Sequence, residues 1–230
     1  MIHELPLLTI RRHFPRPRAE DLAVFAGLQT GHAVDAMGGR GALDYRIKPL
    51  APLAATLVGV AVTCNGGPND NLALFGALDV AKPGDIVIAA ADGFTGAAVA
   101  GDLLVGMMKN KGVGGFITDG LVRDVAGILA VGMPVYCAGV TPNSPDRNGP
   151  ASVGLPIIVG GVPVESGDVV IADGDGVVII PQARIAKTLA ALAGVRAAEA
   201  ALEAKVKAGL EIPDFVLKIL RSDRTVEIGD

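Results

Sequence analysis

Short apolar runs alternate with helix-length segments between residues 57 and 138, and this alternation constrains the fold more than any other feature. Runs rich in Val, Ile and Ala predict strands at 57–63, 86–90, 115–118 and 134–138. The segments between them predict helices at 69–80, 100–111 and 122–130. Strands that alternate with helices in this way form βα units, in which neighbouring strands are parallel.

The pattern changes after this region. Residues 156–180 contain short apolar runs interrupted by Gly160-Gly161, Ser166-Gly167-Asp168 and Asp173-Gly174-Asp175-Gly176, which predicts antiparallel hairpins. Further helices are expected at 19–38 and from Pro181 onward. We therefore expect an α/β fold, with a mixed central sheet and flanking helices.

The chain of 230 residues is long enough for one large core, and it contains no linker-like stretch. Aromatic residues make up only 3% of it, so the core must be built from Ala, Val, Ile and Leu. We expect a single domain over residues 1–230, with an N-terminal arm at 1–18 and a C-terminal helical extension at 181–220. The arm is rich in Pro and Arg, which favours a solvated segment.

Charge and composition argue against several classes of partner. The net charge is −4, and the densest basic stretch, residues 11–18, is interpreted as a Pro-rich solvated terminus. With so few aromatic residues in the chain there is no stacking platform for single strands, so no nucleic acid is expected. The longest apolar stretch, 50–64, is too short to span a membrane and contains Pro52. Cys64 and Cys137 lie apart in strand-like runs, which favours buried, reduced thiols. We expect a soluble cytoplasmic protein.

The chain lacks the residues that several common catalytic mechanisms require. The histidines are His3, His13 and His32, all near the start, which leaves few bases for a Ser-His-Asp or Cys-His site. No Cys/His spacing suits zinc, and neither a dinucleotide nor a Walker motif is present. Hard-cation chemistry with carboxylates remains.

Two segments supply the residues for such chemistry. Gly101-Asp102-Leu103-Leu104 opens a predicted helix, whose first N–H groups can hold a carboxylate. Arg123-Asp124 follows the strand predicted at 115–118, on the side of an α/β sheet where ligands bind. These residue types have a second interpretation, because Asp102 could act only as a helix cap and Arg123-Asp124 only as a surface pair.

The spacing of these residues resembles the signature of class II pyruvate aldolases. Gly101-Asp102-Leu103-Leu104 is followed by Arg123-Asp124, with twenty residues between Asp102 and Arg123. Among these enzymes, the chain resembles the 4-hydroxy-4-methyl-2-oxoglutarate / 4-carboxy-4-hydroxy-2-oxoadipate aldolases of the RraA-like family. The resemblance extends over about residues 25–205 and includes segments 30–38, 68–71 and 166–177.

The resemblance implies a swivelling β/β/α domain that assembles as a homotrimer or homohexamer, with active sites between subunits. It also implies a bound Mg²⁺ or Mn²⁺, with Asp124 as a direct ligand and Asp102 acting through water. Arg123, Gly101 and the N–H groups of Leu103 and Leu104 would bind a 2-oxo acid, with Asp102 and Arg123 as the catalytic residues. Glu199 would reach the metal's water from a neighbouring subunit, although an exposed helix glutamate is an equal interpretation.

The implied activity is that of a metal-dependent lyase that cleaves a C–C bond of a 2-oxo acid through a pyruvate enolate, with oxaloacetate decarboxylation as a related reaction. The alternative is a regulator like the RraA proteins, which bind a ribonuclease without catalysis. Because the regulators tend to lack an acidic residue after the arginine, Asp124 favours the enzyme. The chain departs from the aldolase pattern in the loops at 141–150 and 92–97, which we expect to shape the distal half of a substrate site.

Overall fold

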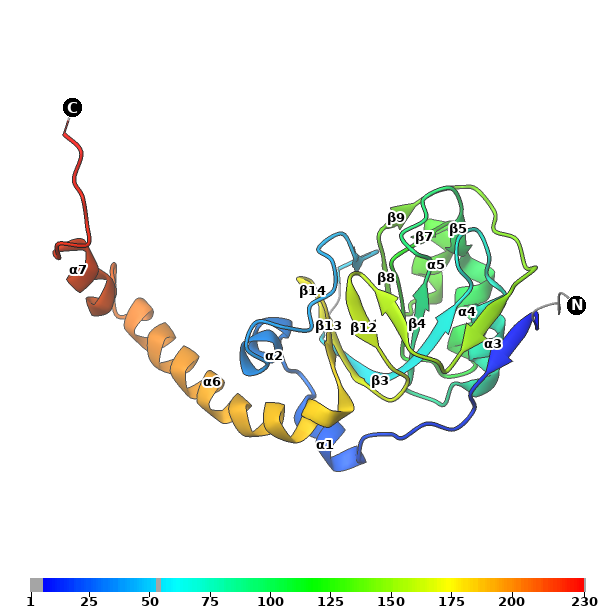
Figure 1. Ribbon diagram of the computed structural model, residues 1–230, viewed down its shortest axis with the longest axis horizontal. Coiled ribbons are helices and arrows are strands. Elements are labelled where there is room, and N and C mark those ends of the chain that lie inside the picture. Colours follow the sequence, from blue (N-terminus) through cyan, green and yellow to red (C-terminus); the bar gives the residue numbers. More distant parts are fainter. Residues whose placement is uncertain (1–5, 53–54, 230) are drawn as a thin grey trace, which may run out of the picture. The chain divides into compact units, whose positions relative to one another are not determined.

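A mixed sheet forms the middle layer of the fold in the computed structural model, which describes residues 6–52 and 55–229 (Figure 1). Its main strands are β1 (Leu8–Ile10), β2 (Lys48–Pro49), β3 (Leu57–Asn65), β4 (Ile86–Ala90), β6 (Gly115–Thr118), β8 (Val135–Cys137) and β10 (Ala151–Val153). They lie in the order β1-β10-β3-β4-β6-β8-β2. The run from β3 to β8 is parallel, as the alternation of strands and helices predicts, whereas β10 and β2 join it antiparallel.

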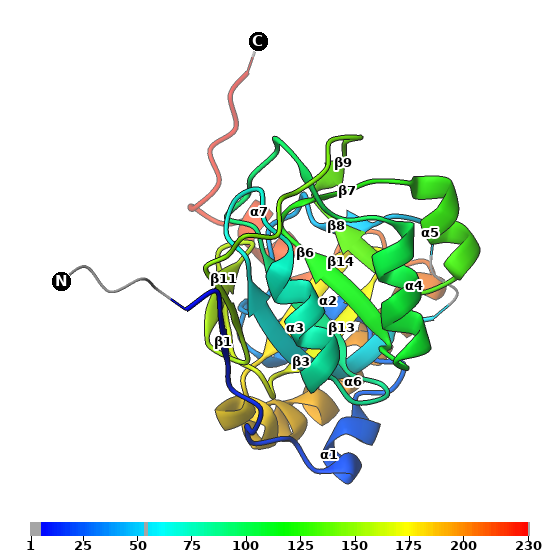
Figure 2. The ribbon, with the colours of Figure 1, turned by 90° about the vertical axis from the view of Figure 1, so that its right-hand side faces the viewer.

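Three helices cover one face of this sheet, as Figure 2 shows. They are α3 (Leu72–Val80), α4 (Asp102–Asn110) and α5 (Val125–Val131). Leu74, Val105 and Ile128 from these helices pack against sheet residues that include Val87 and Phe116. The bounds lie within a few residues of the predicted ones, because buried apolar positions define each helix.

Two hairpins cover the opposite face, which confirms the antiparallel pairing predicted for residues 156–180. They are β11 (Ile157–Val159) with β12 (Val162–Val164), and β13 (Val169–Asp173) with β14 (Gly176–Ile180). β13 also pairs with the first half of β3 and so extends the sheet. Val170 and Ile179 pack against Ile88 and Ile117 of the sheet. The expected α/β fold with a mixed sheet and flanking helices is confirmed.

A small parallel sheet lies beside the main one. It consists of β5 (Ala98–Ala100), β7 (Leu121–Val122) and β9 (Gly139–Val140), in that order. Its strands have only two or three residues, which is too short for a sequence pattern to predict them. They matter for function because each carries a candidate segment at its carboxyl end.

The N-terminal region differs from the expectation in two ways. The helix predicted at 19–38 is two helices, α1 (Ala19–Val24) and α2 (Thr30–Ala36), separated by a turn in which Gly27 has φ +69°. The arm is also not simply solvated. β1 pairs with β10, and Arg16 makes a bidentate ion pair with the buried Asp85 at 2.6 and 2.8 Å. The first five residues of the arm lie outside the described residues.

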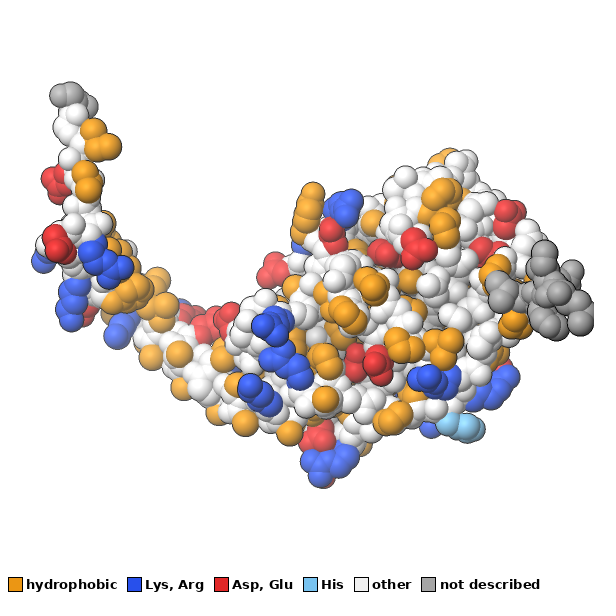
Figure 3. All heavy atoms as spheres, viewed as in Figure 1, with side chains coloured by type: hydrophobic (Ala, Val, Ile, Leu, Met, Phe, Trp, Pro, Cys, Tyr) orange, Lys and Arg blue, Asp and Glu red, His pale blue; other side chains and the backbone are white. Residues whose placement is uncertain are grey.

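The chain divides into two compact units, Met1–Leu192 and Ala193–Asp230. The expectation of a single domain stays a prediction. After a 3₁₀ turn (Gln182–Arg184), α6 (Ile185–Lys207) and α7 (Asp214–Leu220) form the expected C-terminal helices. Figure 3 shows apolar side chains on the surface of the second unit, where Leu202, Val206 and Phe215 are exposed.

Two further expectations concern the cysteines and membranes. Cys64 and Cys137 are free and buried, as predicted, and burial raises the pKa of both thiols. Across the described residues, no helix combines the length and the apolar character that crossing a bilayer requires.

Candidate functional site

The small parallel sheet brings three loop segments to one edge. Gly101 follows β5, Arg123 follows β7 and Thr141 follows β9. The backbone N–H of Arg123 donates to the Ala100 carbonyl at 3.0 Å, and that of Thr141 donates to the Val122 carbonyl at 3.0 Å. The carboxyl ends of parallel strands are where ligands bind in α/β folds. Arg123 directly follows β7, whereas the sequence predicted that it follows the strand at 115–118, which is β6.

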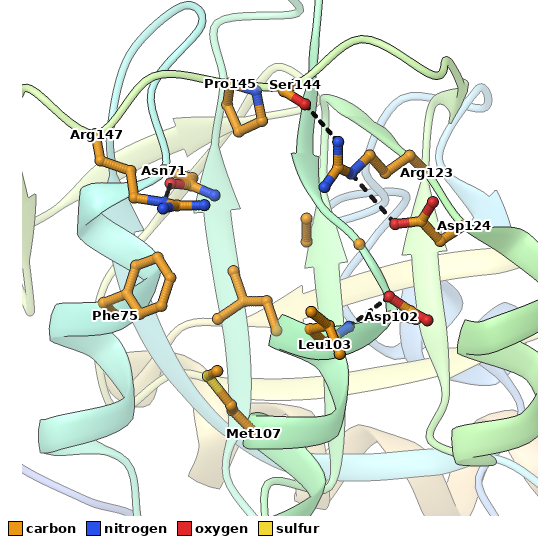
Figure 4. A pocket seen from close by; sticks show the side chains of 13 residues that line it. Asn71, Phe75, Asp102, Leu103, Met107, Arg123, Asp124, Ser144, Pro145 and Arg147 are labelled. Carbon is orange, nitrogen blue, oxygen red and sulfur yellow. Dashed lines mark hydrogen bonds and ion pairs between the residues drawn. The ribbon is translucent and has the colours of Figure 1, made fainter.

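These segments line one cavity of about 280 Å³ (Figure 4). Six predicted residues are among its walls, namely Gly101, Asp102, Leu103, Leu104, Arg123 and Asp124. A cavity of this size suits a small molecule of a few carbon atoms rather than a large cofactor. The structure thus brings together the two segments that the sequence singled out.

The backbone of Gly101 makes room for the side chains of the second segment. A Cβ added at residue 101 would lie 2.5 Å from Asp124 Oδ2 and 3.1 Å from Arg123 Nε. Any side chain at this position would therefore displace the carboxylate or the guanidinium. The glycine is required here for a close approach between the start of α4 and Asp124.

Asp124 holds an uncommon backbone conformation. It lies in the left-handed region, with φ 59° and ψ 46°, directly before α5. Asp and Asn occupy this region more readily than other residues with a side chain. Its Oδ2 lies 3.2 Å from Arg123 Nε, and Arg123 also donates from Nη1 to the hydroxyl of Ser144. The carboxylate and the guanidinium therefore hold each other in the wall of the cavity.

Asp102 begins α4 on the other side of Gly101. Its Oδ1 accepts a hydrogen bond from the N–H of Leu103 at 2.7 Å. Its side chain also lies against Gly127 of α5, where an added Cβ would collide with it. The N–H of Leu103 is thus already engaged by a carboxylate. Substrate binding by the N–H groups of Leu103 and Leu104 stays a prediction.

The cavity also contains residues that the sequence analysis did not assign to it. The most informative are Asn71 and Phe75, and the 141–150 loop, which was expected to shape the site as a segment, contributes Ser144 and Arg147. Asn71 lies in the 68–71 segment that carries part of the family resemblance, which was the available signal for it. Nothing in the spacing indicates that Arg147 would lie opposite Arg123.

Two expectations about other regions have different outcomes. Residues of the 141–150 loop line the cavity, as expected, but residues 92–97 are not among its walls. Gly93 and Thr95 instead line a separate hollow beside Asp119, whose carboxylate accepts the Ala91 N–H at 2.7 Å. Burial raises the pKa of Asp119, and this hydrogen bond opposes the shift.

Glu199 lies on α6 in the second unit. It is not among the residues that line the cavity. Its contribution from a neighbouring subunit stays a prediction.

The cavity offers a small set of carboxylate ligands for a divalent cation. In the described part of the chain, no three His, Cys, Asp or Glu side chains form a group that could enclose a metal. Asp102 and Asp124 nevertheless flank Gly101 in the same cavity, and the space that a Cβ would fill is left to the Asp124 carboxylate. Mg²⁺ is bound in proteins by one or two carboxylates and keeps several waters, so this donor set fits Mg²⁺ or Mn²⁺.

The fold and the cavity define an α/β protein with a paired arginine and aspartate beside a helix N-terminus. The family model described as Aldolase/RraA matches residues 30–179, and the chain belongs to the RraA-like family. A protein of Halalkalibacterium halodurans named "Putative 4-hydroxy-4-methyl-2-oxoglutarate aldolase" is 37% identical over 158 residues, which cover 69% of this chain and 75% of that protein.

Solved structures of the same family share the fold. RraAS2 of Streptomyces coelicolor, described as an unusual member of the RNase ES inhibitor RraA protein family, is 26% identical with a TM-score of 0.72. The alignment covers 83% of this chain and 100% of RraAS2. The RNA-processing inhibitor RraA from Thermus thermophilis is 26% identical with a TM-score of 0.60, over 66% of this chain and 92% of that one.

Proposed function

We propose that the chain is a divalent-metal-dependent lyase that cleaves a C–C bond of a 2-oxo acid and releases pyruvate through its enolate. The observation that carries the proposal is the meeting of Asp102, Arg123 and Asp124 around Gly101, at the start of α4. The aldolase name of the relative that is 37% identical supports the same reaction class.

The residues of the cavity match the charges of such a reaction. Cleavage of the C–C bond that joins the pyruvate part of the substrate to the rest leaves the enolate of pyruvate. Its negative charge develops on the former keto oxygen. Arg123 donates to this oxygen or to the adjacent carboxylate, and its planar guanidinium can hold two oxygens at once. The N–H groups at the start of α4 hold the carboxylate end of the substrate, which replaces the Asp102 carboxylate at the N–H of Leu103. Donors already in position for the developing charge stabilise the transition state most effectively.

A bound Mg²⁺ or Mn²⁺, with Asp124 as direct ligand and Asp102 acting through water, would supply Lewis-acid stabilisation of the negative charge. Asp102 also orients a water molecule that takes the proton from the substrate hydroxyl during cleavage. Oxaloacetate decarboxylation requires the same enolate, so it belongs to the same proposed chemistry.

The assembly is part of the proposal. A homotrimer or homohexamer would place Glu199 of one subunit near the cavity of its neighbour. The small-molecule partner is a 2-oxo acid, and neither a nucleic acid nor a membrane is required. A cytoplasmic location fits this chemistry.

A second candidate function comes from the solved structures. RraAS2 is described as an unusual member of the RNase ES inhibitor RraA protein family, and the Thermus protein as an RNA-processing inhibitor. In this alternative, the chain binds a ribonuclease and the cavity has no catalytic role. The paired Arg123 and Asp124 favour the enzyme, because a surface used only for binding a protein needs no carboxylate beside Gly101.

The test is a screen of 2-oxo acids for release of pyruvate, with Mg²⁺ or Mn²⁺ present. The lyase releases pyruvate from at least one 4-hydroxy-2-oxo acid or from oxaloacetate. Absence of pyruvate from all of them, together with inhibition of a ribonuclease, would select the regulator.

A further inference from the structure

Ser144 holds the arginine of the cavity in one orientation. Arg123 donates from Nη1 to the Ser144 hydroxyl, and its Nε lies 3.2 Å from Asp124 Oδ2, as the dashed lines in Figure 4 show. Because the guanidinium is planar, contacts at two of its nitrogens fix its rotation as well as its place. The third nitrogen, Nη2, can then be presented to a ligand in the cavity.

The segment before Ser144 is fastened to the strand that leads into α4. The Asn143 carbonyl accepts the N–H of Ala98, in β5, at 3.0 Å. The Asn143 side chain donates from Nδ2 to the Gly96 carbonyl at 2.8 Å. These two contacts tie the loop to the same strand that positions the start of α4.

The segment after Ser144 is fastened to the residues just before α3. The N–H of Asp146 donates to the Asn69 carbonyl at 2.7 Å, and the Asp146 carboxylate accepts from Asn69 Nδ2 at 2.9 Å. Ser144 and Pro145 lie between the two anchors, and both line the cavity. The ring of Pro145 restricts the backbone further. The hydroxyl of Ser144 therefore has a fixed place beside Arg123.

A hydroxyl suits this place because it is neutral. Arg123 already faces the carboxylate of Asp124, and a second carboxylate would weaken the positive charge that the cavity presents to an anion. The serine oxygen accepts an N–H without removing that charge. Without the hydroxyl, the guanidinium could rotate about its contact with Asp124. Small displacements of this kind are costly when a group must meet a developing charge.

We propose that Ser144 is a positioning residue, which holds the Arg123 guanidinium where the negative charge of the enolate develops. This inference rests on the proposed lyase function and adds a residue to its site. Ser144 acts on the transition state rather than on binding, because the carboxylate of pyruvate is held at the start of α4. Its loss should therefore lower kcat and leave KM for pyruvate nearly unchanged.

The test follows exchange of the pyruvate methyl protons by proton NMR, in deuterated water with Mg²⁺. Ser144→Ala should lower kcat of exchange about 10-fold, the scale of one hydrogen bond to a charged group. Ser144→Thr keeps the hydroxyl and should restore most of the rate. Ser144→Asp should be slower than Ser144→Ala, because its carboxylate weakens the charge of Arg123. A native rate in Ser144→Asp would contradict the need for a neutral group.

A double-mutant cycle tests whether Ser144 acts through Arg123. Arg123→Lys lacks the planar fork that Ser144 orients, so adding Ser144→Ala to it should lower the rate by less than about 2-fold. A loss by the same factor in both backgrounds would show that the two residues act independently, and this would overturn the inference.

Binding of oxalate gives a readout that does not depend on turnover. Oxalate is a planar dianion that resembles the pyruvate enolate and does not react. Calorimetry on the full-length protein with Mg²⁺ should show that Ser144→Ala weakens oxalate binding by about the factor lost in exchange, while pyruvate affinity stays the same. Equal losses for the two ligands would contradict a role in the transition state.

Thr141→Val is the matched control. It removes a hydroxyl from the same loop, at a residue that is not among the walls of the cavity, and should leave exchange and binding unchanged. Ser144 is exposed, so thermal unfolding should give the same midpoint for Ser144→Ala and the native protein. A native exchange rate in Ser144→Ala would overturn the role of Ser144 and leave the lyase in place. Absence of exchange in the native protein would overturn the lyase, and the inference with it.

Discussion

The Asp124 carboxylate occupies the space that a side chain at Gly101 would fill, since an added Cβ would lie 2.5 Å from Asp124 Oδ2. The two residues follow different strands of the small parallel sheet, β5 and β7, and meet at the start of α4. Their contact joins the helix N-terminus to the carboxylate that is proposed to hold the metal.

Gly101→Ala is therefore expected to abolish most of the activity. The added methyl group pushes the carboxylate or Arg123 away from its position, with a loss of about 10²-fold or more in kcat/KM, as expected for misplaced catalytic groups. Gly106→Ala on the same helix is the control, because its added Cβ would meet only Val131, at 4.0 Å. That variant should keep its activity and gain about 0.5–1 kcal/mol of stability. Equal activities of the two variants would refute the role of the contact.

Asp124 allows charge and backbone conformation to be tested separately. Asn also tolerates the left-handed region, so Asp124→Asn should keep the stability of the native protein while losing about 10²–10³-fold in rate. Asp124→Ala should lose the same activity and, in addition, roughly 1–2 kcal/mol of stability, because Ala is strained at φ 59°. Chemical denaturation and pyruvate release measure the two effects. Near-native turnover of Asp124→Asn would place the metal elsewhere.

Chelation tests the metal directly. Exhaustive treatment with EDTA should abolish pyruvate release, because two carboxylates and an arginine do not replace the charge of a divalent cation at the enolate. Added Mg²⁺ or Mn²⁺ should restore the activity. Full activity in the chelated protein would contradict a metal-dependent mechanism.

Assembly tests the assignment of Glu199. If a neighbouring subunit completes the site, the active species is a closed oligomer, and cyclic symmetry is its common form. Light scattering at assay concentration should give the mass of a trimer or a hexamer, and Glu199→Gln should lower the activity without changing that mass. A fully active monomer would remove the case for a shared site.

The sequence predicted the parts of this structure that depend on local pattern. β4 (Ile86–Ala90) and β6 (Gly115–Thr118) are found at their predicted positions, because runs of buried β-branched and aliphatic residues define them. The helix expected at 19–38 is divided by a turn at Gly27. The turn lets Phe25 and Leu28 pack against β13 and β14, and this long-range packing is not visible in the local sequence pattern. β7 has only two residues, and its existence depends on pairing with β5 and β9.

The candidate site shows the same division. Asp102, Arg123 and Asp124 could be named from their spacing, and the structure places them on one cavity. The left-handed conformation of Asp124 could not be foreseen, because Asp occurs in every backbone region near a helix start. The 141–150 loop was expected to shape the distal half of the site, but the place of Arg147 within it could not be predicted, because it depends on contacts of the loop with Asp70 and Asn71, which are distant in sequence.

The most direct test of the proposed function is proton exchange at the methyl group of pyruvate. Formation of the enolate needs only the pyruvate half of the cavity, where Arg123 and the proposed metal on Asp124 would stabilise the negative charge and the water held by Asp102 would take the methyl proton. No knowledge of the complete substrate is required. The protein is incubated with pyruvate and Mg²⁺ in deuterated water, and the methyl signal is followed by proton NMR. Arg123→Lys keeps a positive charge but loses the planar fork, so it should slow exchange strongly while metal binding persists. The lyase predicts metal-dependent loss of the methyl signal in the native protein, and no exchange above the rate in buffer would contradict it.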